Sequence, residues 1–195
     1  MGYDKPETLF SGSTYANPGF NGNISGLIWK SVGDLGIRKY DFTYDAVSRL
    51  MSADFNEYTS GSFNKTTGID FSMSMGDGVN PDSAYDKNGN IKKMRQMGWK
   101  VSSSSYIDEL TYTYQASSNK LLKIKDLIND PNSKRGDFKD GPNTGDDYLY
   151  DGNGNMIRDN NKGMNTILYT HLNMPYEVRI PGKGKILYTY DNLGT

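Results

Sequence analysis

Large apolar side chains recur at every second position in several short segments of the chain. The segments 40–44, 110–114 and 186–190 each place three of them in this way, with polar or small residues between. A period of two puts such residues on one face of a β-strand. Glycine is frequent, with 22 residues, and long runs of Ala, Leu and Glu are missing, which disfavours helices. The pattern predicts an all-β fold, and the only weak helix candidate, 121–128, is equally consistent with a strand.

The alternating segments belong to a repeat of about 20 residues with insertions. A tyrosine-aspartate pair followed by turn residues occurs at Tyr44-Asp45, Tyr85-Asp86, Tyr150-Asp151 and Tyr190-Asp191. Less regular copies centre on Phe20, Tyr114 and Tyr169. Each copy has the form of a strand, a turn and a returning strand. We therefore expect successive antiparallel β-hairpins with the anchor aromatics, among them Tyr44, Tyr114, Tyr150 and Tyr190, in equivalent positions.

The residues between the strands specify turns. Asn88-Gly89 and Asn153-Gly154 favour a hairpin turn with positive φ at both central residues, capped by the carboxylate of the preceding aspartate. Pro175 marks the start or edge of a strand because it lacks an amide donor, and 182–185 is predicted to be a further hairpin turn. The stretches 59–82 and 129–147 are rich in Gly, Ser, Asn and Asp and are interpreted as insertions or loops.

With these motifs the chain resembles the Rhs/YD-repeat family, which includes bacterial Rhs proteins, shells of insecticidal toxin complexes and teneurins. The resemblance runs from about residue 20 to the end. It implies a twisted, spiralling antiparallel sheet that forms part of the wall of a hollow shell or cocoon, often around a C-terminal toxin. The chain lacks the family's core region with its self-cleaving aspartates. We divide it into an N-terminal extension or linker, 1–19, and a YD-repeat β region, 20–195, truncated at its C-terminus.

Composition excludes several classes of function. The net charge is −1 and the charges are interspersed, so nucleic acid is not an expected partner. The chain has no cysteine, which excludes disulfides and thiol chemistry. No apolar run is long enough to span a membrane. The first residues do not form a signal peptide, so the export signal of a secreted or cell-surface bacterial parent is expected outside this fragment.

No constellation of residues predicts catalysis or metal binding. His171 is the only histidine, which excludes a Ser-His-Asp triad, and we expect it on a strand face where other repeats carry tyrosine. The pairs Asp108-Glu109 and Asp146-Asp147 suggest glycoside hydrolysis, but adjacent strand residues point to opposite faces, and we interpret them as solvated loop acids. The segments 86–90 and 151–155 are similar to calcium loops but lack the bidentate glutamate at the twelfth position.

The sequence predicts a non-catalytic structural segment, without cofactors, that builds a β-shell carrying or enclosing a C-terminal toxin. Its expected partners are the other repeats of the parent chain, and a toxin or another protein docked on an open sheet edge at 186–190. An alternative is an adhesin-like module that binds glycans or a partner protein through exposed aromatics and loops. Exposure of Trp29 and Trp99 on one concave face would favour binding, and their burial between repeats would favour the scaffold.

Overall fold

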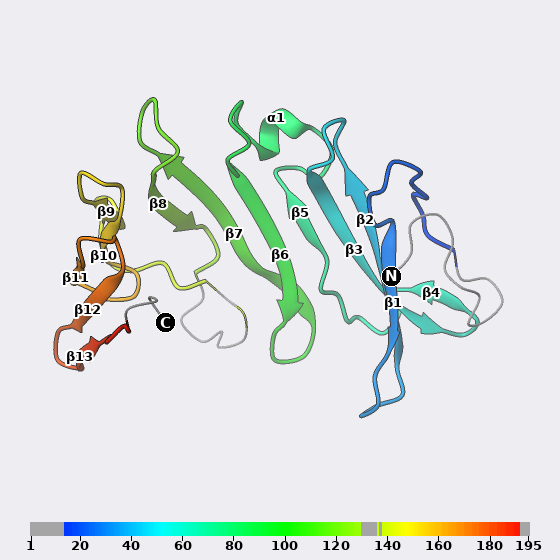
Figure 1. Cartoon of the computed structure of the whole chain (residues 1–195). Coiled ribbons are helices and arrows are strands. Elements are labelled where there is room, and N and C mark those ends of the chain that lie inside the picture. The colour runs from blue at the N-terminus through cyan, green and yellow to red at the C-terminus, as the bar shows by residue number, and fades with distance from the viewer. Residues whose placement is uncertain (1–13, 130–135, 137, 192–195) are drawn as a thin grey trace. The chain divides into compact units, whose positions relative to one another are not determined.

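The computed structural model describes residues 14–129, 136 and 138–191, which form antiparallel β-strands and one short helix (Figure 1). The elements in chain order are β1 (Gly26–Lys30), β2 (Ile37–Tyr44), β3 (Leu50–Thr59), β4 (Ser62–Asn64), β5 (Met73–Met75), α1 (Pro81–Ala84), β6 (Lys93–Trp99), β7 (Ser104–Tyr114), β8 (Leu121–Asp126), β9 (Tyr148–Tyr150), β10 (Met156–Asp159), β11 (Thr166–Tyr169), β12 (Pro175–Ile180) and β13 (Gly184–Leu187). The predicted all-β fold is confirmed, and 121–126 is a strand.

The strands form three sheets. The largest has the order β1-β2-β3-β5-β6-β7-β8 with β4 also paired to β3, and the smaller sheets are β10-β9 and β11-β12-β13. Every strand pair with a described register is antiparallel. The chain divides into two compact units, one with residues 1–111 and 126–138 and the other with 112–125 and 139–195. Within each sheet, strands that are neighbours in sequence pair in space as predicted, with one exception at β3. Strands β8 and β9, and β10 and β11, are consecutive but belong to different sheets.

The exception lies in 59–82, where the prediction of a loop was wrong. This stretch contains β4, which folds back on the end of β3, and β5, which lies inside the sheet between β3 and β6. Strand β5 is only three residues long and is surrounded by Gly, Ser and Asp, so its local pattern is too short to identify. Its position depends on pairing with β3, through Ser52 opposite Ser74, and with β6.

The sheet of the first unit has an apolar face and a polar face. On the apolar face Phe55 of β3 is 1% exposed and its ring lies 5.4 Å from Tyr40 and 5.2 Å from Phe71. Trp29 of β1 stacks on Tyr40 at 5.5 Å. The register brings Ser52, Ser74, Arg95 and Glu109 into one row on the other face. Alternation along each strand therefore separates an aromatic core from a polar surface.

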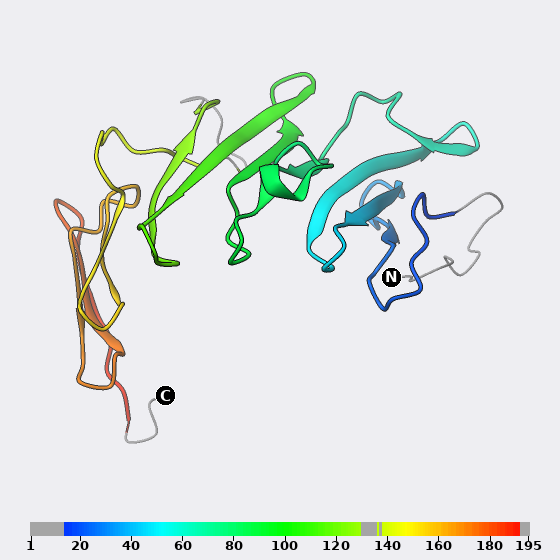
Figure 2. The same ribbon diagram turned by 90° about the horizontal axis from the view of Figure 1, so that it is seen from above.

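Helix α1 covers one end of the apolar face. Asn80 caps it by accepting the Asp82 N–H, and Pro81 occupies its first turn, where a missing amide costs nothing. Ala84 is fully buried and clusters with Met51, Met75 and Tyr85. Viewed from above in Figure 2, α1 lies against the ends of β5 and β6. This four-residue helix was not predicted, although an Asn before a Pro is typical of a helix N-terminus.

The second unit contains smaller sheets with cores of their own. Tyr148, Ile167 and Val178 are buried on β9, β11 and β12. Strand β12 begins at Pro175, as predicted. The Lys183 N–H donates to the Ile180 carbonyl and closes the turn into β13, so the predicted hairpin at 182–185 is also confirmed.

The predicted N-terminal extension contributes to the first unit. Residues 1–13 lie outside the described residues, but Tyr15 is buried against Gly26 of β1. Lys39 donates to the Thr14 carbonyl, and the Ala16 N–H donates to Asp41. The end of this segment therefore packs on β1 and β2.

No helix within the described residues is long and apolar enough to cross a membrane.

Candidate functional site

The same turn follows the tyrosine in several repeats. In 86–90 the Asp86 N–H donates to the Asn90 carbonyl and the Gly89 N–H to the Asp86 carbonyl. One carboxylate oxygen of Asp86 accepts the N–H groups of Asn88 and Asn90, and the other accepts the Asn90 side-chain amide. The segment 151–155 repeats every one of these bonds around Asp151. The aspartate of the pair therefore organises the turn, as the sequence predicted.

The predicted backbone conformation of these turns was wrong in one respect. Among their described central residues only the glycine has positive φ, 88° at both Gly89 and Gly154, whereas Asn88 and Asn153 do not. This is the three-residue hairpin loop in which a left-handed residue follows a type I turn. Ser48 and Asn173 take the left-handed position in 45–49 and 170–174. The aspartate capping bonds favour the longer loop over the two-residue turn.

Five of the anchor tyrosines are attached to the preceding hairpin. The hydroxyl of each donates to the backbone carbonyl of the residue that leaves the preceding turn, over 2.5–2.9 Å. The five pairs are Tyr44 with Ile24, Tyr85 with Leu50, Tyr150 with Leu121, Tyr169 with Met156, and Tyr190 with Pro175. We call this arrangement the tyrosine clasp. It fixes one hairpin to the next through a side chain at a constant place in the repeat.

Cationic residues reinforce two of the clasps. The Arg49 guanidinium lies 4.4 Å from the centre of the Tyr85 ring while its Nε donates to Asp45. Lys120 occupies the corresponding place at the end of the preceding turn and lies 5.7 Å from the Tyr150 ring. A cation over an aromatic face contributes about 0.5–2 kcal/mol, depending on how far it is desolvated. In these two clasps, both the hydroxyl and the ring of the tyrosine therefore contact the preceding hairpin.

The clasp tyrosines are partly withdrawn from water. Burial raises the pKa of Tyr44, Tyr150 and Tyr169 above the ordinary tyrosine value. Burial also raises the pKa of Tyr85, and the opposing effect of Arg49 does not cancel it. These phenols are therefore protonated donors at neutral pH, the state that the clasp needs.

The sequence placed most, but not all, anchor aromatics correctly. Tyr44, Tyr150 and Tyr190 occupy equivalent positions, as expected, and Tyr85 and Tyr169 share them. Tyr114, the other tyrosine of the prediction, ends β7 directly before the turn that the Gln115 N–H closes on the Lys120 carbonyl. Phe20 is 87% exposed and has no hydroxyl, so it does not form a clasp. His171 lies exposed in the 170–174 turn, not on a strand face, because β11 ends at Tyr169.

The carboxylates of the turns are already occupied by donors. Both oxygens of Asp86 and of Asp151 accept N–H groups from their own turns. These bonds, led by the amides of Asn90 and Asn155, lower the pKa of both carboxyls. The described part of the chain brings together no group of three or more His, Cys, Asp or Glu side chains suited to a metal ion. Each of these carboxylates is therefore used within its own turn.

The two carboxylate pairs are not the solvated loop acids that we expected. Asp108 is buried in β7 and accepts the Phe138 N–H, while Glu109 on the opposite face binds Arg95. Asp147 is fully buried and accepts the Ile124 N–H, whereas its neighbour Asp146 is exposed. Neither pair converges on one site, as predicted, but Asp108 and Asp147 satisfy buried backbone donors. Local sequence does not reveal those partners, because they lie 30 and 23 residues away.

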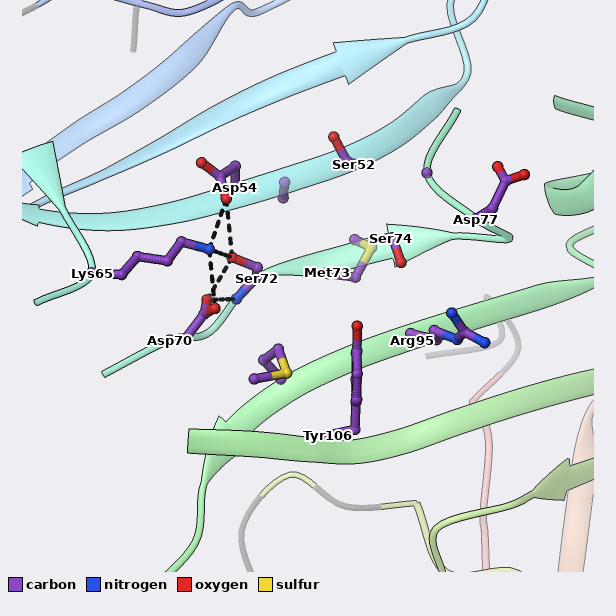
Figure 3. A pocket seen from close by; sticks show the side chains of 13 residues that line it. Ser52, Asp54, Lys65, Asp70, Ser72, Met73, Ser74, Asp77, Arg95 and Tyr106 are labelled. Carbon is purple, nitrogen blue, oxygen red and sulfur yellow. Dashed lines mark hydrogen bonds and ion pairs between the residues drawn. The ribbon is translucent and has the colours of Figure 1, made fainter. Parts of the chain in front are cut away.

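A separate feature of the first unit is a hollow of about 570 Å³ on the polar face of the sheet. It is lined by residues of β3, β5, β6 and β7 and of the segments 65–72 and 77–78. Figure 3 shows Tyr106 rising from β7 between a lysine cluster on one side and Arg95 on the other. The Tyr106 side chain is 44% exposed, and Arg95 lies 5.9 Å from its ring. We call this feature the Tyr106 hollow.

The lysine cluster at its rim is a tight ion-pair network. The Lys65 ammonium lies 2.8 Å from Asp54 and 3.0 Å from Asp70, and it donates to the Ser72 hydroxyl at 2.8 Å. Burial lowers the pKa of Lys65, but the bonds to both carboxylates outweigh burial and raise it overall. The single ammonium of this cluster is therefore shared by two carboxylates.

The two tryptophans do not meet either condition set by the sequence. Trp29 is half-buried in the aromatic cluster, and Trp99 at the end of β6 is 36% exposed. The strand register places them on opposite faces of the sheet. They therefore do not form a shared aromatic platform.

Comparison of the chain with known protein families, characterised proteins and solved structures gives no match.

Proposed function

We propose that the chain is a non-catalytic structural segment of an Rhs/YD-repeat type protein, in which the tyrosine clasp joins successive hairpins into a continuous β-wall. The observation that carries this proposal is the recurrence of one hydroxyl-to-carbonyl bond in five repeats. A catalytic role would predict a single constellation of reactive groups. Recurrence instead points to a task that every repeat performs alike.

The energetics of a repeat support this role. A hairpin alone is at best marginally stable in water, so each unit depends on its neighbours. A clasp hydrogen bond contributes about 0.5–1.5 kcal/mol, and the tyrosine ring adds buried area beside it. Both contributions act between hairpins. The clasp therefore makes the stability of one unit depend on the next.

The wider parts of the proposal follow from the resemblance of the Tyr-Asp motifs. The parent protein is secreted or displayed on a bacterial cell surface, its repeats form a spiralling shell, and the shell carries or encloses a C-terminal toxin. Antibodies against residues 14–129 test the location: labelling of intact source cells, or detection in culture medium, supports it. Labelling only after lysis would contradict it.

Replacing Tyr85 with phenylalanine tests the clasp. The change removes one hydroxyl, leaves the Leu50 carbonyl without its donor and should lower the free energy of unfolding by about 1–3 kcal/mol. Hydrogen exchange should become faster in both hairpins that the clasp joins, at 44–50 and 85–91. The matched control is Tyr188→Phe, at an exposed tyrosine, which should change neither quantity. Faster exchange confined to 85–91 would show that the clasp does not couple hairpins.

A second candidate function is glycan binding by an adhesin-like surface. The observation that favours it is the Tyr106 hollow, which combines an exposed aromatic ring with polar side chains. The tryptophans give it no support, because they lie on opposite faces. It is kept as the alternative to the scaffold.

A further inference from the structure

The Tyr106 hollow takes no part in the tyrosine clasps. Its lining residues lie between Ser52 and Tyr106, all within the first unit, and the clasp tyrosines are not among them. Its volume of about 570 Å³ lies in the usual range for small-ligand sites, roughly 300–1,000 Å³. The architecture of the repeat therefore does not explain this feature.

Two hydroxyl groups in the hollow are available to a ligand. Within the described residues, neither the Tyr106 hydroxyl nor the Ser74 hydroxyl makes a hydrogen bond to another side chain or to the backbone. Ser74 lies on β5 and Tyr106 on β7, and Figure 3 shows both side chains at the hollow. Hydroxyls can donate and accept at once. They suit a ligand that itself carries both donors and acceptors.

The charged groups favour a neutral ligand over an ion. The hollow is lined by three carboxylates, Asp54, Asp70 and Asp77, and by two cations, Lys65 and Arg95. Lys65 pairs with Asp54 and Asp70, and Arg95 pairs with Glu109. An anion would meet an excess of carboxylates here, and a cation would compete with Lys65 and Arg95 for the paired carboxylates. A neutral hydroxyl donates to a paired carboxylate or accepts from a paired cation without breaking either pair.

The Tyr106 ring supplies the apolar part of the site. The face of an aromatic ring carries partial negative charge, and it attracts C–H groups polarised by neighbouring oxygens. A sugar ring presents such C–H groups on one face and hydroxyls around its rim. Met97, directly opposite Tyr106 in the register, extends this apolar surface. The hollow thus matches both chemical faces of a pyranose.

We propose that the Tyr106 hollow is a binding site for a neutral oligosaccharide, with one sugar ring against Tyr106 and its hydroxyls bonded to Ser74, Arg95 and Asp54. This inference rests on the second candidate function, glycan binding, and places the sugar-binding site at the Tyr106 hollow. The site lies on one face of the first unit, so it can operate on a protein whose repeats are otherwise architectural.

Titration calorimetry and saturation-transfer NMR of the whole chain test the proposal, with maltotriose, cellotriose and triacetylchitotriose as probes. At least one of them should bind with millimolar or tighter affinity. Tyr106→Ala should weaken that binding about tenfold, and Tyr106→Phe, which keeps the ring, should weaken it less. Tyr188→Ala is the matched control, because Tyr188 is also 44% exposed, and it should bind like the unaltered chain. Backbone NMR spectra of each variant verify that it is folded.

The possible failures separate the site from the function. Sialyllactose is included as an acidic probe. If neither the three neutral probes nor sialyllactose binds the unaltered chain at millimolar concentration, both the site and the glycan-binding function are wrong. If a probe binds but Tyr106→Ala and Tyr106→Phe leave its affinity unchanged, glycan binding stands and this site is wrong. Binding of sialyllactose alone would show that the hollow selects an acidic sugar and would overturn the argument from charge.

Discussion

Replacing Phe55 with alanine should lower the free energy of unfolding by about 3–5 kcal/mol. Phe55 is 1% exposed, and its ring contacts Trp29, Tyr40 and Phe71, so truncation leaves a cavity in the aromatic cluster. A domain is usually stable by only about 5–15 kcal/mol. Urea denaturation followed by tryptophan fluorescence measures the loss, because Trp29 reports on this cluster.

Phe20→Ala is the matched control for this prediction. Phe20 is 87% exposed, and its truncation should change stability by less than about 0.5 kcal/mol. If Phe55→Ala were as mild as Phe20→Ala, the aromatic cluster would not be the core of the first unit. The large difference expected between two phenylalanines comes from burial alone.

Replacing Asp147 with alanine should destabilise the second unit by about 3 kcal/mol. The fully buried carboxylate accepts the Ile124 N–H at 2.8 Å and the Asn143 side-chain amide at 2.7 Å. Alanine leaves the Ile124 N–H buried without an acceptor, and such a group costs about 1–3 kcal/mol by itself. Hydrogen exchange at the Ile124 amide should accelerate together with the loss of global stability.

The adjacent residue provides the control. Asp146 is exposed, and its backbone carbonyl accepts the Asn160 side-chain amide, a bond that Asp146→Ala preserves. This variant should lie within about 0.5 kcal/mol of the unaltered chain. Equal effects of the two substitutions would mean that Asp147 does not hold β8 through Ile124. The comparison also tests our revised interpretation, in which one acid of the pair is structural and the other solvated.

Function and stability place different demands on the two faces of the first sheet. The apolar face carries the ring cluster and the α1 contacts, which the fold needs. The polar face carries the Tyr106 hollow, for which we propose a binding role. Variants of the apolar face are expected to act on stability. Variants at Tyr106 are expected to act on binding.

Features that depend on residues close together in the chain could be predicted from the sequence. Alternation at 40–44 and 110–114 predicts strands because a strand has a period of two. The Tyr-Asp pairs predict turns because a carboxylate can accept amides two and four residues ahead, as Asp86 and Asp151 do. The clasp position of the tyrosines is visible as a repeat. These interactions join residues close together in the chain, so residue types and their spacing are enough to predict them.

Features that join segments far apart in the chain could not be predicted from the sequence and are visible only in the folded structure. The carbonyl that accepts each clasp hydroxyl lies 13 to 35 residues away, and no local pattern identifies it. Strand β5 is three residues long and is a strand only because β3 and β6 pair with it. Asp147 is buried where it accepts the Ile124 N–H, 23 residues away in the sequence. The Tyr106 hollow forms where residues of four strands come together on one face of the sheet. Each of these features depends on contacts between residues far apart in the chain, so a short stretch of sequence cannot predict it.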